Sequence, residues 1–353
     1  MHINKLMIFL IGILATAIFT IGDSFAQYKN TQVDWGIHPP AHSAVGQAGW
    51  QFLKLPATAR YAAVGGITTS LSHGDASTVL ANPASIADVK DIGVSFSSMN
   101  WIADIKYQSA SFVKNMREWG SFGVKFIYLD YGDMMRTENV EQFDEAGNSL
   151  GRTSPTLGLG TFSGGDIAIG LCYARQITDR LQVGGSLNYL REELDNAATS
   201  NWTIDIGTTY YTGIKTLRLS MIGRNFGPDA EFAKYDERIA IPAVQVPMPM
   251  VFLFGVAYDV FEGGDKSPHL LTVAAEFTHP NDGNEKVHVG AEYSYHGWIR
   301  LRGGYRFNYD EEGLTIGGGL KLHTNSFGLL IDYAYLDYGR LNMVQMVSVG
   351  FEL

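Results

Sequence analysis

Ionisable side chains recur at alternate positions in the last third of the chain, where they could bind or conduct charged solutes. The apolar residues between them give the period-two pattern of strands with two unlike faces. Acidic and basic residues alternate from one stretch to the next, so these side chains could instead pair with one another. If these stretches are strands of a membrane barrel, as argued below, the ionisable side chains face its interior. We then favour an ion-pair ladder over a solute-selective channel lining, because unpaired charge inside a membrane is costly. The predicted ladder comprises Glu276, Glu292, Arg300, Arg302, Arg306, Lys321 and Asp332.

Motifs of common catalytic and metal sites are missing from the sequence. The nine histidines show no H-E-x-x-H spacing, and neither a G-x-S-x-G elbow nor a P-loop occurs. Gly158 and Gly160 are similar to the start of a nucleotide loop, but no strand–loop–helix context follows. The single cysteine, Cys172, is expected to be an inert small residue. We therefore expect no catalytic residue, no cofactor and no metal, and we expect that the protein is not an enzyme.

The first residues have the features of a secretory signal peptide. Lys5 precedes an apolar run that ends near Gly22, and Ser24-Phe25-Ala26 supplies small residues at the cleavage positions. The sequence predicts a signal peptide over residues 1–26, with an uncleaved membrane anchor as the alternative. No later apolar stretch reaches the roughly eighteen residues of a membrane helix. With a net charge of −10 and no dense Lys/Arg tract, the chain is not expected to bind nucleic acid.

From residue 91 onward, stretches of alternating apolarity are separated by breaks. About fourteen can be counted, and most have the nine to eleven residues of a tilted membrane-spanning strand. The two long connections, residues 131–165 and 226–249, both follow odd-numbered stretches, as expected if they lie on the same side of a membrane. The stretches are approximately 91–99, 105–114, 119–130, 166–176, 181–191, 201–213, 215–225, 250–261, 268–278, 286–296, 298–308, 313–323, 325–336 and 343–353.

This pattern predicts an all-β protein, a transmembrane antiparallel β-barrel over residues 91–353 that contacts lipid of the outer membrane. A large soluble β-sandwich or β-helix is the alternative, although its strands would usually be shorter.

An Ala- and Gly-rich segment, residues 49–90, precedes the first predicted strand. Its apolar residues have no strand period, and residues 76–87 could form a short helix that Asn82-Pro83 interrupts. A barrel of about fourteen strands has a lumen wide enough for a plug. We expect residues 49–90 to enter the lumen from the periplasmic side as a plug, or hatch, with residues 27–48 as a periplasmic arm. A loose periplasmic arm throughout is the alternative.

The two long connections are where a rigid barrel would carry a binding function. The first is acidic and contains Met134, Met135 and Phe143. The second ends in an apolar, proline-stiffened run that includes Val244, Val246 and Met248. We predict that these side chains bind a protein partner. A solvated lid is the alternative for the first connection, and packing over the barrel mouth is the alternative for the second.

Several motifs resemble those of one family of outer-membrane proteins. The segment before the barrel contains Phe52-Leu53-Lys54-Leu55, a run from Ala59 to Gly66, and Ala81-Asn82-Pro83-Ala84. The barrel contains Tyr173-Ala174-Arg175 and Leu301-Arg302-Gly303-Gly304-Tyr305. Together these motifs resemble the PorV/PorQ family of FadL-like proteins, from residue 49 to the C-terminus. The hatch motif of that family would correspond to Arg60, Gly65, Gly66, Asn82, Pro83 and Ala84.

The resemblance implies a fourteen-stranded barrel with an N-terminal hatch that serves type IX protein secretion or surface attachment. The implied partners are secreted cargo proteins, bound through their C-terminal signal domains, and subunits of the type IX secretion machinery. The alternative function is that of FadL proper, a transporter of hydrophobic small molecules such as long-chain fatty acids. The charged lumenal faces argue against a wide apolar pocket for such a ligand, without excluding a small one.

Overall fold

The computed structural model describes residues 46–71, 74–144, 146–156, 158–231, 245–261, 267–324 and 327–353. The predicted signal peptide, residues 27–45 of the predicted arm, and Val244 lie outside these ranges. Within them, no helix is long and apolar enough to cross a membrane.

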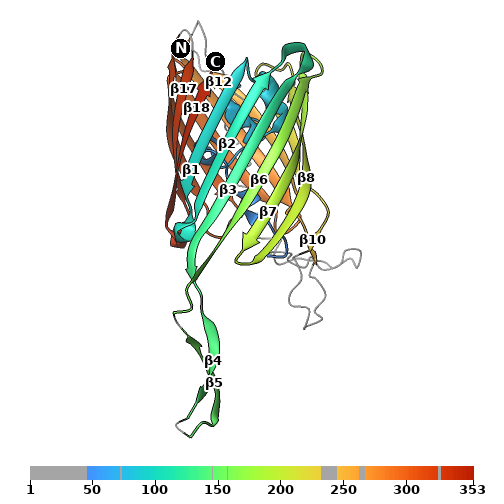
Figure 1. The fold of residues 1–353 in the computed structure, drawn as a ribbon. Helices are drawn as coiled ribbons and strands as arrows, with labels where there is room; N and C mark the ends of the chain where they lie inside the picture. Colours follow the sequence, from blue (N-terminus) through green and yellow to red (C-terminus); the bar gives the residue numbers. More distant parts are fainter. Residues whose placement is uncertain are drawn as a thin grey trace, which may run out of the picture. The chain divides into compact units, whose positions relative to one another are not determined.

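Fourteen antiparallel strands form a closed barrel (Figure 1). Strands that follow one another around the barrel follow one another along the chain, and β1 pairs with β18 to close the barrel. This architecture confirms the predicted fold, and each predicted stretch corresponds to one strand with shifted ends. The strands are β1 Ile92–Asn100, β2 Lys106–Asn115, β3 Ser121–Met135, β6 Thr161–Gln176, β7 Leu181–Leu194, β8 Ala197–Tyr211, β9 Arg218–Phe226, β12 Val251–Phe261, β13 His269–Pro280, β14 Lys286–Tyr295, β15 Ile299–Phe307, β16 Leu314–His323, β17 Gly328–Asp337 and β18 Met343–Glu352.

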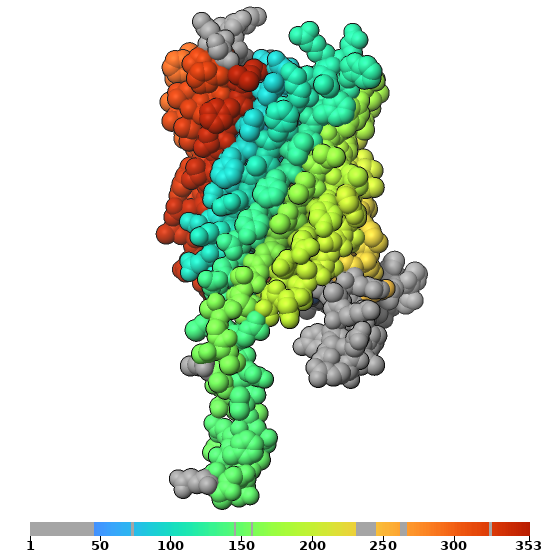
Figure 2. Space-filling view, viewed as in Figure 1, coloured from blue at the N-terminus to red at the C-terminus, as the bar shows by residue number. Residues whose placement is uncertain are grey.

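The outward face of the barrel is apolar and exposed. Buried and exposed positions alternate along β1, and Phe96 on its outward side is 52% exposed. Figure 2 shows the neighbouring strands crossing the visible face at a strong tilt. Exposed tryptophans lie near both ends, Trp119 and Trp298 at one end and Trp202 at the other. A tilted, closed barrel with an apolar belt and aromatic girdles is the form in which strands cross an outer membrane.

The connections make the two ends of the barrel unlike. At one end, residues 177–180 join β6 to β7 and residues 296–298 join β14 to β15; we call this the short-turn end. At the other, the long-loop end, residues 136–160 join β3 to β6 and residues 227–250 join β9 to β12. Because bacterial barrels keep short turns in the periplasm and longer loops outside, the short-turn end faces the periplasm.

The first long connection contains strands that the sequence analysis did not predict. β3 continues to Met135, and β4 Glu138–Phe143 pairs with β5 Ser149–Thr156 as a separate two-stranded sheet. This hairpin extends beyond the barrel at the long-loop end (Figures 1 and 2). Both of its faces are solvated, so its strands lack the apolar alternation by which strands are recognised. In the second connection, β10 Ala230–Glu231 pairs with β11 Gln245–Val246.

Residues 46–71 and 74–90, the lumenal segment, form four short helices. Thr58, Asp75 and Asn82 each cap a helix by accepting a backbone hydrogen bond from the following turn. The helix predicted over residues 76–87 is interrupted as expected, and Pro83 begins its second part, where a missing N–H costs nothing. The four helices are η1 Gln51–Lys54, α2 Ala59–Ala63, η2 Ala76–Leu80 and η3 Pro83–Asp88.

The lumenal segment begins at the long-loop end of the barrel and finishes at the short-turn end. The Gly49 N–H donates to the carbonyl of Pro247, 3.1 Å away in the second long connection. At the other end, the Asn115 side chain donates to the carbonyl of Val89 at 2.6 Å. Residues 46–48 were predicted in a periplasmic arm and instead lie at the opposite end. Because β1 starts at the short-turn end, a segment that packs Trp50 at the long-loop end must cross the lumen.

Candidate functional site

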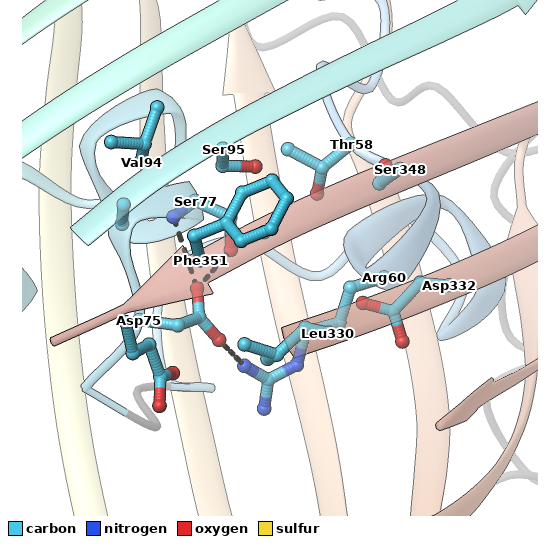
Figure 3. A pocket seen from close by; sticks show the side chains of 13 residues that line it. Thr58, Arg60, Asp75, Ser77, Val94, Ser95, Leu330, Asp332, Ser348 and Phe351 are labelled. Carbon is cyan, nitrogen blue, oxygen red and sulfur yellow. Dashed lines mark hydrogen bonds and ion pairs between the residues drawn. The ribbon is translucent and has the colours of Figure 1, made fainter. Parts of the chain in front are cut away.

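A cluster of buried charged side chains joins the lumenal segment to the barrel wall. Arg60 in α2 forms ion pairs with Asp75 and with Glu292 of β14, the latter at 3.3 Å. Figure 3 shows the Arg60 and Asp75 side chains directed toward each other. In the wall, Arg302 of β15 bridges Glu292 and Asp332 of β17, with both N–O distances 2.5 Å. All five side chains are buried, and each has a partner of opposite sign. Breaking such a network is costly because it leaves a buried charge unpaired.

Glycines in the wall make room for this cluster and for the backbone of the lumenal segment. β16 separates Arg302 from Asp332, and a Cβ at Gly319 of that strand would overlap the ion pair between them. At Gly304 of β15, a Cβ would overlap the backbone of Gly65. Close approach of the lumenal segment to the wall therefore depends on positions that carry no side chain.

Two other predicted ladder residues hold the backbone of the lumenal segment. Glu276 of β13 accepts hydrogen bonds from the N–H groups of Thr68 and Thr69, both at 2.8 Å. Arg306 of β15 donates to the carbonyl of Gly65 at 3.2 Å. These two side chains therefore bind the backbone of the lumenal segment.

The remaining ladder residues lie on the same side of the barrel. Lys321 of β16 pairs with Glu352 of β18 at 2.6 Å. Arg300 of β15 is half-buried on the inward side of its strand. The structure thus places the seven predicted residues on β13 to β17, and it brings Glu292, Arg302 and Asp332 into one network.

The predicted hatch motif lies at the turns of the lumenal segment. Gly65-Gly66 has φ angles of 80° and 81°, a left-handed conformation that residues with a Cβ rarely adopt. Asn82 donates to the carbonyl of Thr69 at 2.9 Å, which joins the two halves of the segment. Its Oδ1 accepts from the N–H of Ala84 at 3.0 Å and caps η3. With Arg60 in the charged cluster, the motif residues shape the segment and fasten it to the wall.

The cavity beside the charged cluster is too small for a solute. Thr58 and Asp75 line it from the lumenal segment, and Ser95 and Ser348 line it from β1 and β18 (Figure 3). Its volume of about 20 Å³ is room for a single water molecule. Among the described residues, no group of three or more His, Cys, Asp or Glu side chains could hold a metal ion.

An apolar surface on the inward side of the wall was missed by the sequence analysis. In the long-loop half, seven neighbouring strands, β7, β6, β3, β2, β1, β18 and β17, carry apolar side chains at inward positions. Trp50, Phe52 and Leu55 of the lumenal segment pack against them. Barrel interiors are usually polar, so this lining is unusual. We call it the apolar lumenal patch; it comprises Leu190, Ala168, Ile127, Leu129, Tyr107, Met99, Met346, Val344, Ala334 and Leu336.

A sequence signal for the patch exists in runs that are apolar on both faces of a strand. Phe126-Ile127-Tyr128-Leu129 is one such run. Alternation alone hides it, because the outward residues of these strands are apolar as well.

Polar contacts at the long-loop end hold the first turn of the lumenal segment. Lys54 Nζ donates to both carboxylate oxygens of Asp282, at 2.5 and 2.6 Å, and Gln51 donates to Asp282 Oδ2 at 2.8 Å. Burial alone would raise the pKa of the Asp282 carboxyl. The hydrogen bonds from Lys54 and Gln51 outweigh burial and hold this pKa below its ordinary value. The carboxylate is therefore charged at neutral pH, and the contact is intact there.

The predicted partner-binding residues occupy unlike positions. Met135 in β3 and Phe143 in β4 are exposed, and Met134 and Val246 are half-buried. Met248 is only 1% exposed and belongs to the same apolar core as the patch. Met248 therefore takes the alternative predicted for the second connection, because an apolar run beside an apolar surface gains more by packing over the barrel mouth than by facing water.

Comparisons with known proteins support the fold. Residues 37–149 match the model of the Uncharacterised protein family (UPF0164), and no curated protein matches the sequence. The Pseudomonas putida toluene transporter TodX is 12% identical with a TM-score of 0.52, covering 84% of this chain and 98% of that one. A Pseudomonas aeruginosa FadL homologue is 9% identical with a TM-score of 0.51, at 84% and 98% coverage.

At such identities the similarity shows a shared fold, and it does not single out the PorV/PorQ family. Together with the closed barrel and its apolar belt, it defines the chain as a fourteen-stranded β-barrel of the outer membrane, similar in fold to FadL-type proteins.

Proposed function

We propose that this protein carries hydrophobic small molecules across the outer membrane, with the apolar lumenal patch as their binding surface. The patch is the observation on which the proposal rests. Water-filled barrels have polar interiors, whereas here one half of the lumen presents apolar side chains from seven neighbouring strands. The similarity in fold to a toluene transporter supports the same function.

In this proposal the lumenal segment is a plug of which one part can move. α2 is fastened by the buried charged cluster, which is costly to break. η1 is instead held by the contacts of Lys54 and Gln51 with Asp282 at the rim, where Lys54 is partly exposed. A hydrophobic ligand that displaces Trp50 and Phe52 replaces the apolar contacts that the patch loses when these side chains leave. Displacement of η1 is therefore the least costly way to open the lumen.

Uptake of labelled toluene tests the proposal. The protein is expressed in the outer membrane of Gram-negative cells that lack their own channel for hydrophobic molecules, and uptake is compared with cells that carry no added protein. We expect faster uptake, and slower uptake for Leu129→Gln, which places an amide in the patch. Leu150→Gln, on the exposed hairpin, is the matched control and should behave as wild type. Uptake that is no faster with the protein than without it rejects the proposal.

Docking of a secreted protein is a second candidate, favoured by the β4–β5 hairpin. Val140 and Phe143 are 46% and 58% exposed on a two-stranded sheet outside the barrel. An isolated hairpin is marginally stable in water, so exposed apolar residues on it suit contact with a partner. A role in type IX secretion would use this surface. The resemblance to the PorV/PorQ family supports the same role.

A pull-down from the native host tests this second candidate. The tagged wild-type protein should bring down secreted proteins that share a C-terminal domain, and a variant without residues 138–156 should not. If both recover the same proteins, the hairpin is not the docking surface. If neither recovers any after cross-linking, the transporter proposal stands alone.

A further inference from the structure

One lumenal row of side chains ends in two adjacent carboxylates. The strand register pairs Met99 with Tyr107, Tyr107 with Leu129, Leu129 with Asp166, and Asp166 with Glu192. All five lie on the inward faces of neighbouring barrel strands, one each on β1, β2, β3, β6 and β7. The first three belong to the apolar lumenal patch, so this row runs from the patch to Asp166 and Glu192.

These two carboxylates lack the Arg or Lys partners that several other buried carboxylates have. Asp75, Asp332 and Asp205 each pair with Arg or Lys. In the described part of the chain, neither Asp166 nor Glu192 takes part in an ion pair. Asp166 Oδ2 accepts a hydrogen bond from the Tyr131 hydroxyl at 2.7 Å. Its Oδ1 is buried and has no partner, and Asp166 as a whole is 1% exposed.

Placing the two groups opposite each other has a cost. Like charges directly opposite on neighbouring strands are destabilising, and burying a charge without a counter-charge adds to that cost. Among the described residues, the Glu192 carboxylate accepts one hydrogen bond, a long one of 3.4 Å from the Trp50 N–H. The pair therefore gains from a positive charge that this part of the chain does not supply.

A second, independent feature of the row also points to a ligand. The Tyr107 hydroxyl is fully buried and has no hydrogen-bond partner. It lies on the lumenal face two strands from Asp166, with Leu129 between them. A polar group left unsatisfied beside an apolar lining requires an explanation, and a bound molecule that is mainly apolar with a polar head provides one.

We infer that the lumen binds hydrophobic molecules that carry an ammonium group, with Asp166 and Glu192 receiving the cation and the apolar lumenal patch receiving the chain. The inference rests on the proposed transport function and names its substrate class. A hard metal ion fits the row less well, since Ca²⁺ takes about six to eight oxygen ligands and the surrounding side chains are apolar. An ammonium group needs few acceptors, which the two carboxylates supply. The hydrocarbon chain of the same molecule would pack against Leu129 and Ala168 beside the carboxylates.

Access to the pair requires movement of the first turn of the lumenal segment. Trp50 lies beside Glu192 and has φ 45° and ψ 42°, a left-handed conformation that is costly for a residue with a bulky side chain. Release of this conformation offsets part of the cost of displacing the turn. The ligand thus takes the place of the residues that fill the patch in its absence.

Equilibrium dialysis tests the inference with three probes of equal chain length: octylammonium, 1-octanol and octanoate. The full-length mature protein is reconstituted in nanodiscs, and binding to empty nanodiscs is subtracted. We expect octylammonium to bind about 10- to 100-fold more tightly than octanol, the range for hydrogen bonds to charged groups. Octanoate should bind more weakly than octanol because the carboxylates repel it.

The double variant Asp166→Asn/Glu192→Gln should lose the preference for octylammonium and keep the affinity for octanol. Glu193→Gln is the matched control: this residue follows Glu192 in the chain, pairs with Arg191 and is exposed. Heat-modifiable gel mobility verifies that each variant forms the barrel.

The outcomes separate this inference from the transport proposal. Failure of all three probes to bind the wild type overturns both. Equal affinity for octylammonium and octanol overturns the inference alone, as does a preference that survives in the double variant. Displacement of octylammonium by micromolar Ca²⁺ assigns the carboxylates to a metal and also overturns it.

Discussion

Replacement of Arg60 by methionine tests how the lumenal segment is held in the barrel. The substitution removes a guanidinium that is 2% exposed and keeps most of the volume of the side chain. Glu292 retains Arg302 at 2.5 Å, so it remains paired. Asp75 loses its only ion-pair partner among the described residues and keeps hydrogen bonds from Ser77. The consequence of the substitution is therefore a stranded Asp75 carboxylate.

The size of the effect follows from that single stranded charge. Removing one partner of a buried ion pair costs about 3–5 kcal/mol. Because Asp75 still accepts from the Ser77 N–H and hydroxyl, we expect the lower end, about 3 kcal/mol, or roughly a 150-fold shift toward the undocked segment. Arg340→Met is the control, because Arg340 is 89% exposed and its pair with Glu311 is screened by water.

Hydrogen exchange measured by mass spectrometry reads this shift directly. In Arg60→Met, peptides that cover α2 should exchange about 100-fold faster, while peptides from β1 and β2 should not change. Adding Asp75→Asn to Arg60→Met removes the stranded charge and should restore part of the protection. Unchanged exchange in α2 would refute the reasoning. Equal acceleration in α2 and in the barrel strands would also refute it, since docking and barrel stability would then be one process.

Three further predictions concern the wall, the rim and the barrel itself. Gly304→Ala places a methyl against the backbone of Gly65 and should destabilise docking by about 1–3 kcal/mol, seen as faster exchange at residues 62–68, whereas Gly318→Ala, with no atom closer than ordinary contact, should have no effect. Because the pKa of Asp282 is lowered by its contacts, the stabilisation of η1 is complete above the ordinary value of about 3.9 and is lost as pH falls through the lowered value. Exchange of η1 should therefore accelerate only in acid, and Asp282→Asn should abolish that pH dependence. The detergent-extracted protein should shift in gel mobility on boiling, and recovery in the soluble fraction with no such shift would contradict the membrane barrel.

The barrel strands could be predicted because each has one face in lipid and one face in the lumen. In β15, Leu301 and Tyr305 face outward while Arg302 and Arg306 face inward, and this contrast appears directly as a period of two. The hairpin could not be predicted in the same way. Glu138–Phe143 and Ser149–Thr156 have water on both faces, so no contrast distinguishes one set of positions from the other.

The inward position of the ladder residues followed from the same alternation, whereas their partners did not. Arg60 and Glu292 are separated by 232 residues, and only the path of the lumenal segment brings them together. That path depends on Gly304, where a Cβ would overlap the backbone of Gly65, and the wall ion pair of Arg302 with Asp332 depends on the space left by Gly319. A glycine in a strand is visible in a sequence, but the group that it admits is not.

The two halves of the lumenal segment are attached by interactions that respond to different molecules. Near α2, attachment is ionic and buried, so no apolar ligand can replace it. Near η1, attachment combines the contacts of Lys54 and Gln51 with Asp282 at the rim and apolar contact of Trp50 and Phe52 with the patch. In the transport proposal, a hydrophobic ligand replaces the apolar part of this attachment. In that proposal, one end of the segment yields to a ligand while the other keeps the segment in the barrel. If both ends were held by buried ion pairs, the lumen would stay closed to such a ligand, and if both were held by apolar contact alone, the ligand would expel the whole segment.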